Sequence, residues 1–138
     1  MIEDLYRRLV LEHAKHPRHR GSLPAATHAA TVDNPLCGDV VTLRLVVERD
    51  RIAAVAHDGH GCALSTAAAS LLAERLVGLD VPAARSLAAT FTAFVAAPAA
   101  AAVPLELGEL AAFAGVRAFR ARRDCATLPL RALLDALG

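Results

Sequence analysis

Residues 41–58, VTLRLVVERDRIAAVAHD, decide the fold. Alternate residues from 41 to 47 are apolar, a period of two that is typical of a strand with one buried face. The polar run 48–51 predicts a turn, and residues 52–57 continue as a second strand. Residues 29–34 provide a candidate third strand. The sequence therefore predicts an antiparallel hairpin at the centre of the molecule.

Outside this stretch, apolar residues recur every three or four positions, which predicts helices. The predicted helices cover residues 2–16, residues 62–78, a segment beginning at Asp80, a short segment from Leu107 that stops at Gly115, and a last one ending at Leu137. Thr127 is expected to cap the last helix, because Pro129 suits a first turn better than an interior. Cys125 would then lie just before or within that first turn. A helix, then strands, then helices predict one α+β domain over residues 1–138.

Composition narrows the class of protein. The net charge of +1 does not indicate the strongly positive surface that is typical of a nucleic-acid-binding protein. No apolar run reaches the roughly 18–20 residues that a bilayer requires. The acidic start at residues 1–4 leads directly into an amphipathic pattern, unlike a signal peptide. We therefore expect a cytoplasmic protein that binds neither nucleic acid nor membrane.

The three cysteines are an odd number, which fits no complete disulfide framework. Cys37 and Cys62 each adjoin a glycine at a bend, and Cys125 precedes the last predicted helix. Loops and helix N-termini expose a thiol and favour its thiolate. With Asp39, these thiolates would supply the four ligands of a tetrahedral zinc, and a [2Fe–2S] centre also takes four. The alternatives are small buried cysteines and a turn-forming aspartate.

Histidine and arginine side chains offer further chemistry. His57 and His60 lie near Cys62 in the sequence, so a cysteine–histidine nucleophile pair is a rival interpretation. The remaining histidines are expected at the surface or at helix ends: His13, His16, His19 and His28. Four arginines are interpreted mainly as residues of a solvent-exposed loop: Arg117, Arg120, Arg122 and Arg123.

Three ordered motifs carry a family resemblance. They are Asn34-Pro35-Leu36-Cys37-Gly38-Asp39, Gly59-His60-Gly61-Cys62-Ala63-Leu64-Ser65 and Cys125-Ala126-Thr127-Leu128. Together they resemble the signature segments of the NifU N-terminal/IscU/SufU family, and the likeness covers nearly the whole chain. An added segment around residues 92–115 is similar to the SufU branch. Asp124 stands where the IscU branch has a histidine.

The resemblance implies a three-stranded antiparallel sheet packed on one face by about five helices, with a metal site at one end. It implies zinc bound by Cys37, Asp39, Cys62 and Cys125, and a role as a sulfur acceptor in iron–sulfur cluster assembly. Cys125 matches the cysteine that takes persulfide sulfur from a partner cysteine desulfurase, and Arg122 would steer the persulfide or the partner. Further partners would be downstream assembly or acceptor proteins.

Two alternatives accompany this expectation. The protein could be a scaffold that holds iron or a [2Fe–2S] cluster on Cys37, Cys62 and Cys125, or a zinc-stabilised adaptor without catalysis. Cys125 is favoured as the acceptor because a ligand on a flexible segment before a helix is the easiest to release. Asp124 beside it could cap the last helix, compete with Asp39 for the metal, or weaken attraction for anionic sulfur.

Overall fold

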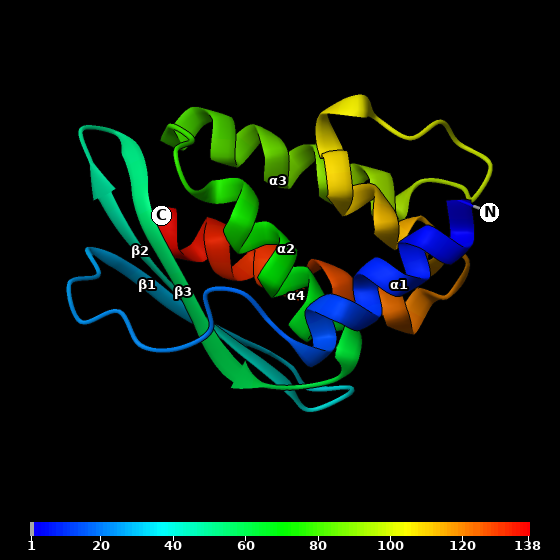
Figure 1. Cartoon of the computed structure of the whole chain (residues 1–138), viewed down its shortest axis with the longest axis horizontal. Helices are drawn as coiled ribbons and strands as arrows, with labels where there is room; N and C mark the ends of the chain where they lie inside the picture. The colour runs from blue at the N-terminus through cyan, green and yellow to red at the C-terminus, as the bar shows by residue number, and fades with distance from the viewer. Residues whose placement is uncertain (1) are drawn as a thin grey trace.

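Figure 1 shows the computed structural model of the chain, in which the helices lie against one face of a three-stranded antiparallel sheet. The structure describes residues 2–138, with side chains from Asp4 onward. The side chain of Ile2, the first residue of the predicted helix 2–16, therefore lies outside the described side chains. The α+β architecture expected from the sequence is confirmed.

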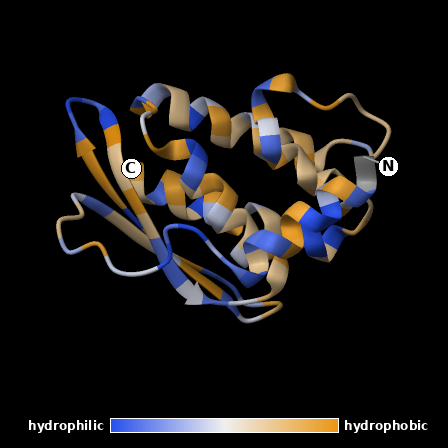
Figure 2. Cartoon of the chain, viewed as in Figure 1, coloured by the Kyte–Doolittle hydropathy of each residue, from blue (hydrophilic) through white to orange (hydrophobic). Residues whose placement is uncertain are grey.

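The sheet has the strand order β1-β2-β3. Its strands are β1 (His28–Asn34), β2 (Asp39–Glu48) and β3 (Arg51–His60). Alternate side chains of β2, from Val41 to Leu45, are buried, as the period of two predicts. Arg49 and Asp50 form the turn with φ angles of 52° and 65°, which suit a tight hairpin. Figure 2 shows this turn in blue beside the orange apolar positions of the strands. β3 extends to His60, which pairs with Val40, whereas the predicted strand ended at residue 57.

The helices supply the other layer of the fold. They are α1 (Ile2–Lys15), α2 (Ala63–Leu76), α3 (Val81–Ala96), the 3₁₀ helix η1 (Leu105–Ala118) and α4 (Arg120–Leu137). α4 packs on β1 and β2, while α2 lies between α1 and α4. Asp80 caps α3 as predicted, since its side chain accepts from the Ala83 amide at 2.8 Å. Among the described residues, no helix has the length and apolar character needed to span a bilayer.

The last helix begins earlier than predicted. α4 starts at Arg120, so Cys125 lies inside it and Thr127 does not cap it. The Thr127 hydroxyl instead donates to the carbonyl of Arg123, one turn back, at 3.1 Å. Pro129 lies within α4. Arginine and alanine are strong helix formers, and they extend the helix on the N-terminal side of the proline.

The segment before α4 also differs from its prediction. η1 continues past Gly115 and contains a kink at Gly108, whose φ and ψ are 53° and −127°. Its apolar face is nevertheless the one expected, because Leu107 and Phe113 are buried. Arg75 of α2 holds the kink by donating to the carbonyl of Leu107 at 2.6 Å. The segment is therefore fastened to the helical layer rather than being a free loop.

Candidate metal centre

The turn between β1 and β2 positions Cys37 and Asp39. The carbonyl of Asn34 accepts from the amides of Cys37 and Gly38 at 3.2 and 2.8 Å. The side-chain oxygen of Asn34 accepts from the Leu36 amide at 3.2 Å. Gly38 has a φ of 76°, which glycine adopts more readily than other residues. The turn leaves Cys37 exposed and Asp39 buried at the start of β2.

Cys62 lies between the end of β3 and the first turn of α2. Its backbone amide donates to Oδ1 of Asp39 at 3.0 Å. Gly61 permits this approach, because a Cβ there would lie 2.8 Å from Cγ of Asp39 and 2.6 Å from Oγ of Ser65. Ser65 is buried and donates to the carbonyl of Cys62 at 3.1 Å. The second cysteine motif is therefore tied to the first through Asp39.

Cys125 reaches the same place from α4. Because α4 packs on β1 and β2, its second turn lies beside the β1–β2 turn. The Sγ atoms of Cys125 and Cys37 are 3.9 Å apart. Cys125 is only 7% exposed. The expectation of an exposed thiol on a flexible segment was wrong for this cysteine, because the helix begins five residues before it.

Three of the four predicted ligands converge on one point. Cys37, Asp39 and Cys125 each present a ligand atom within 4.8 Å of the others. A tetrahedral zinc with bonds of about 2.3 Å places two sulfurs about 3.8 Å apart, close to the observed 3.9 Å. Oδ2 of Asp39 is buried and has no hydrogen-bond partner among the described residues. A bound cation would satisfy that oxygen, so these side chains fit a thiolate-rich metal site.

The fourth predicted ligand lies at the rim of this group. The sulfur of Cys62 is outside the set of mutually close ligand atoms. Its sulfur lies 3.9 Å from Oγ of Ser65, and its backbone amide donates to Oδ1 of Asp39. Cys62 is therefore a neighbour of the cluster that contacts one of its members.

The site shifts the acidity of two groups in opposite directions. Burial by itself would raise the pKa of Asp39, but hydrogen bonds from the thiols of Cys62 and Cys37 and from the Cys62 amide lower it below its usual value. Burial raises the pKa of Cys125, and the nearby thiols of Cys62 and Cys37 add to the increase. Asp39 is thus held as a carboxylate, whereas Cys125 is held as a neutral thiol unless a cation compensates its charge.

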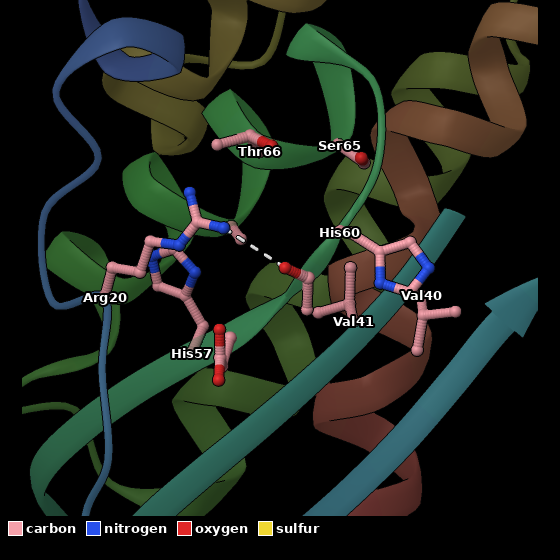
Figure 3. A pocket seen from close by; sticks show the side chains of 10 residues that line it. Arg20, Val40, Val41, His57, His60, Ser65 and Thr66 are labelled. Carbon is pink, nitrogen blue, oxygen red and sulfur yellow. Dashed lines mark hydrogen bonds between the residues drawn. The ribbon is translucent and has the colours of Figure 1, made fainter. Parts of the chain in front are cut away.

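The rival cysteine–histidine pair is not formed. His57 is buried, and its Nε2 donates to the carbonyl of Arg18 at 2.8 Å. Since a carbonyl only accepts, this nitrogen carries the ring proton. Figure 3 shows His57 and His60 pointing away from each other on β3. The hydrogen bond described for His57 therefore fastens the chain after α1 to the sheet rather than reaching Cys62.

His13 lies in the last turn of α1, which agrees with the predicted surface or helix-end position. It is buried there, with Nδ1 2.6 Å from Oγ of Ser70 and Nε2 3.6 Å from Oε1 of Glu74. Ser70 already accepts from the Arg18 amide at 2.8 Å, so its own proton is available for His13. This buried cluster joins α1 to α2.

The arginine run divides between the core and the surface. Arg117 is buried, donates to the carbonyl of Ala101 at 2.9 Å and stacks over Phe94, so its assignment to a solvated loop was wrong. Arg122 is exposed and stacks on the ring of Phe119 at 5.2 Å. Asp124 is exposed on α4 and is not part of the close ligand set. Its position inside the helix also removes it as the helix cap.

The chain matches the model of one known protein family. The model of the NifU-like N-terminal domain matches residues 5–126. The chain belongs to this family. The match includes every cysteine of the sequence and Asp39. The family resemblance inferred from the three motifs is therefore confirmed.

Individual relatives cover nearly all of the chain. It is 36% identical over 136 residues to an iron–sulfur cluster assembly scaffold protein IscU from Streptococcus pyogenes, covering 99% of this chain and 84% of the relative. It is 32% identical over 132 residues to the zinc-dependent sulfurtransferase SufU of Bacillus subtilis, covering 96% and 88%. The N-terminal part of a NifU-like protein from Brucella abortus superimposes with a TM-score of 0.84 at 27% identity, covering 99% and 94%. Relatives with different stated roles therefore share this fold.

Two residues of the quoted motifs, Asn34 and Ser65, support the site in a role that was not predicted for them. Asn34 closes the Cys37 turn through its carbonyl and its side chain. An asparagine before a proline and a glycine-containing turn is a signal that could have identified it. Ser65 supports the Cys62 backbone from the first turn of α2. A serine at the third position of a helix gives no comparable signal.

Proposed function

We propose that this protein is a zinc-dependent sulfur acceptor of cytoplasmic iron–sulfur cluster assembly, which takes persulfide sulfur from a cysteine desulfurase. The observation that carries the proposal is the convergence of Cys37, Asp39 and Cys125. Oδ2 of Asp39 is buried there and has no hydrogen-bond partner among the described residues. Cys62 adjoins this group and completes a set of three thiols and one carboxylate. Membership of the NifU-like N-terminal domain family supports the same function.

Zinc would be held by Cys37, Asp39, Cys62 and Cys125. When bound, zinc keeps coordinating thiols deprotonated without adding redox chemistry. That property matters most for Cys125, since burial raises the pKa of its thiol. The low pKa of Asp39 keeps an anionic oxygen ready for the cation.

In the proposed reaction, the Cys125 thiolate attacks the terminal sulfur of the desulfurase persulfide. A new sulfur–sulfur bond forms on Cys125, the persulfide bond of the partner breaks, and the partner's cysteine leaves as a thiolate. No electrons are gained or lost overall. Because Cys125 is buried, the packing around its sulfur must open before the donor can reach it.

The second candidate function is a scaffold on which a [2Fe–2S] cluster is assembled for a downstream acceptor protein. The observation that favours it is the 36% identity to the streptococcal IscU. A [2Fe–2S] centre takes four ligands, which the same side chains could supply. Asp124 stands where the IscU branch has a histidine, which favours the sulfur-acceptor function. A zinc-stabilised adaptor without sulfur transfer is the third candidate.

Metal analysis and desulfurase turnover separate these functions. A sulfur acceptor contains one tightly held zinc, lacks visible absorption, and accelerates release of alanine from cysteine by the desulfurase. A cluster scaffold takes up iron and sulfide and becomes coloured. An adaptor contains zinc but leaves desulfurase turnover unchanged. Turnover that is accelerated equally by the wild type and by Cys125→Ala would exclude Cys125 as the acceptor.

A further inference from the structure

Two hollows adjoin on the face formed by α1 and the first turn of α2. The larger encloses about 570 Å³ between α1, η1 and the start of α4. The smaller encloses about 510 Å³ beside the ends of α1 and β3. Leu11 lines both hollows, and the consecutive residues Ala63 and Leu64 line one each. The hollows therefore form one band, here called the α1–α2 groove, that passes one residue from Cys62.

The centre and one end of the α1–α2 groove are apolar. Val10, Leu11 and Leu64 line its middle, and Val103 and Phe119 line the larger hollow. Leu11 is 48% exposed and Phe119 is 56% exposed. Large apolar side chains gathered in one hollow mark an interaction site more often than scattered ones do. The groove therefore offers apolar anchoring positions for a partner.

Positive charge flanks this apolar centre on both sides. Arg7 and Arg122 line the larger hollow, and Lys15 and Arg20 line the smaller one. No aspartate or glutamate lines either hollow among the described side chains. This distribution is uneven for a chain whose net charge is only +1. An occupant with matching charge must carry carboxylates on both sides of an apolar segment.

Two of the cationic side chains, Arg20 and Arg122, are held in place by the fold. Arg122 stacks on the ring of Phe119 at 5.2 Å. Arg20 donates from Nη2 to the carbonyl of Gly59 at 3.1 Å, the dashed line in Figure 3. Side chains that are already ordered lose less entropy when a partner binds. Arg122 also lies one helical turn before Cys125, which connects the groove to the thiol cluster.

We propose that the α1–α2 groove is the docking site for an acidic segment of the cysteine desulfurase, with an apolar centre that packs between Leu11 and Leu64. This proposal rests on the proposed function, which requires such a donor at the thiol cluster. Docking here places the partner beside Cys62 at the middle of the groove and beside Arg122 at its larger end. The groove would align the donor while leaving the metal ligands free to react.

Binding of the organism's own desulfurase to zinc-loaded protein tests the proposal, with zinc content measured for every variant. Leu11→Glu places a carboxylate in the apolar centre, and Val77→Glu is its control, since Val77 is 43% exposed at the opposite end of α2. Lys15→Glu reverses a charge in the smaller hollow. Arg131→Glu makes the same reversal at an exposed position of α4 outside the groove. None of these residues belongs to the metal cluster.

We expect Leu11→Glu to weaken binding by about tenfold or more, as loss of a buried anchor does. Lys15→Glu should slow association by about tenfold at low salt, and the difference should shrink at high salt. Both controls should bind like the wild type, and all variants should retain zinc.

If both groove variants bound the desulfurase as the wild type does, the docking site would be overturned while the proposed function stayed intact. An effect of these variants on self-association alone would assign the groove to a second copy of the chain and would also overturn the proposal. If the wild type does not bind the desulfurase at all, the proposed function fails together with the docking site.

Discussion

The sulfur atoms of Cys37 and Cys125 lie 3.9 Å apart although 88 positions separate these residues in the sequence. The contact exists because α4 packs on β1 and β2, which brings its second turn to the β1–β2 turn. Asp39 and Cys62 adjoin the same point, and the Cys62 amide donates to Asp39. A metal ion bound there would therefore link the sheet, α2 and α4.

Asp39 is expected to be essential for metal retention. Asp39→Asn keeps an oxygen that can accept from the Cys62 amide but removes the negative charge. Zinc affinity, measured by competition with a chelator, should fall at least about tenfold, since losing even a supporting group of a metal site has that effect. Asp58→Asn is the matched control, because Asp58 is an exposed carboxylate on β3. Equal affinity in Asp39→Asn and the wild type would remove Asp39 from the ligand set.

Without metal, the three thiols should react at different rates. Cys37 and Cys62 are exposed, whereas Cys125 is buried and its thiol pKa is raised. Since the thiolate is the reactive form, we expect iodoacetamide at neutral pH to label Cys37 and Cys62 before Cys125. Mass spectrometry of peptides during the reaction measures this order. Labelling of Cys125 first would show that its helix opens more readily than its packing indicates.

Gly61→Ala should disrupt the site through direct steric contact. The added Cβ would lie within 3 Å of the Asp39 carboxylate and of Oγ of Ser65. We expect loss of bound zinc and a destabilisation of about 1–3 kcal/mol, as for an overpacked core position. Gly115→Ala is the control, because a Cβ there meets nothing within 4 Å. Chemical denaturation and zinc content of both variants measure the difference, and a Gly61→Ala protein with normal zinc would contradict the described approach of Cys62 to Asp39.

The stability of the fold should depend on pH through His57. Burial lowers its pKa below the ordinary value of 6.5, outweighing the hydrogen bond to Arg18. Between the two values the unfolded chain binds more protons than the folded one, so the free energy of unfolding falls as pH drops below about 6.5. His57→Gln can still donate to the Arg18 carbonyl but does not titrate.

Urea denaturation from pH 7.5 to 5 tests this linkage. The loss of stability on acidification should be smaller in His57→Gln than in the wild type. It should not disappear, because burial also lowers the pKa of His13. If the His57→Gln variant lost as much stability as the wild type over this range, His57 would have to be protonated equally in the folded and unfolded states.

Sequence patterns predicted those features that depend on local order. The alternation from Val41 to Val47 predicted β2, and Asp80 predicted the start of α3. The family motifs contain Cys37, Asp39 and Cys125, whose ligand atoms the fold brings together, while their role as metal ligands stays a prediction. These signals work because strand period, helix caps and cysteine-containing turns are encoded by neighbouring residues.

Features that depend on tertiary packing were missed. Pro129 suggested a helix start, but helix-forming residues before it and contacts of α4 with the sheet extend the helix to Arg120. Arg117 was assigned to a solvated loop by residue type, yet it is buried with partners from other segments. Nothing in the local sequence indicated that His13, at the end of α1, would be buried against Ser70 of α2. Such partners cannot be read from local sequence, because burial is decided by elements that meet only in the folded chain.

The central claim is that sulfur arrives on Cys125 of a zinc-containing protein. The most direct measurement is mass spectrometry of this protein after brief incubation with the desulfurase and cysteine, with thiols and persulfides trapped by alkylation. We predict one additional sulfur atom on the peptide that contains Cys125, none on those that contain Cys37 or Cys62, and undiminished zinc before the reaction. Sulfur found first on Cys37 or Cys62, or on no cysteine while the desulfurase turns over, would contradict this account.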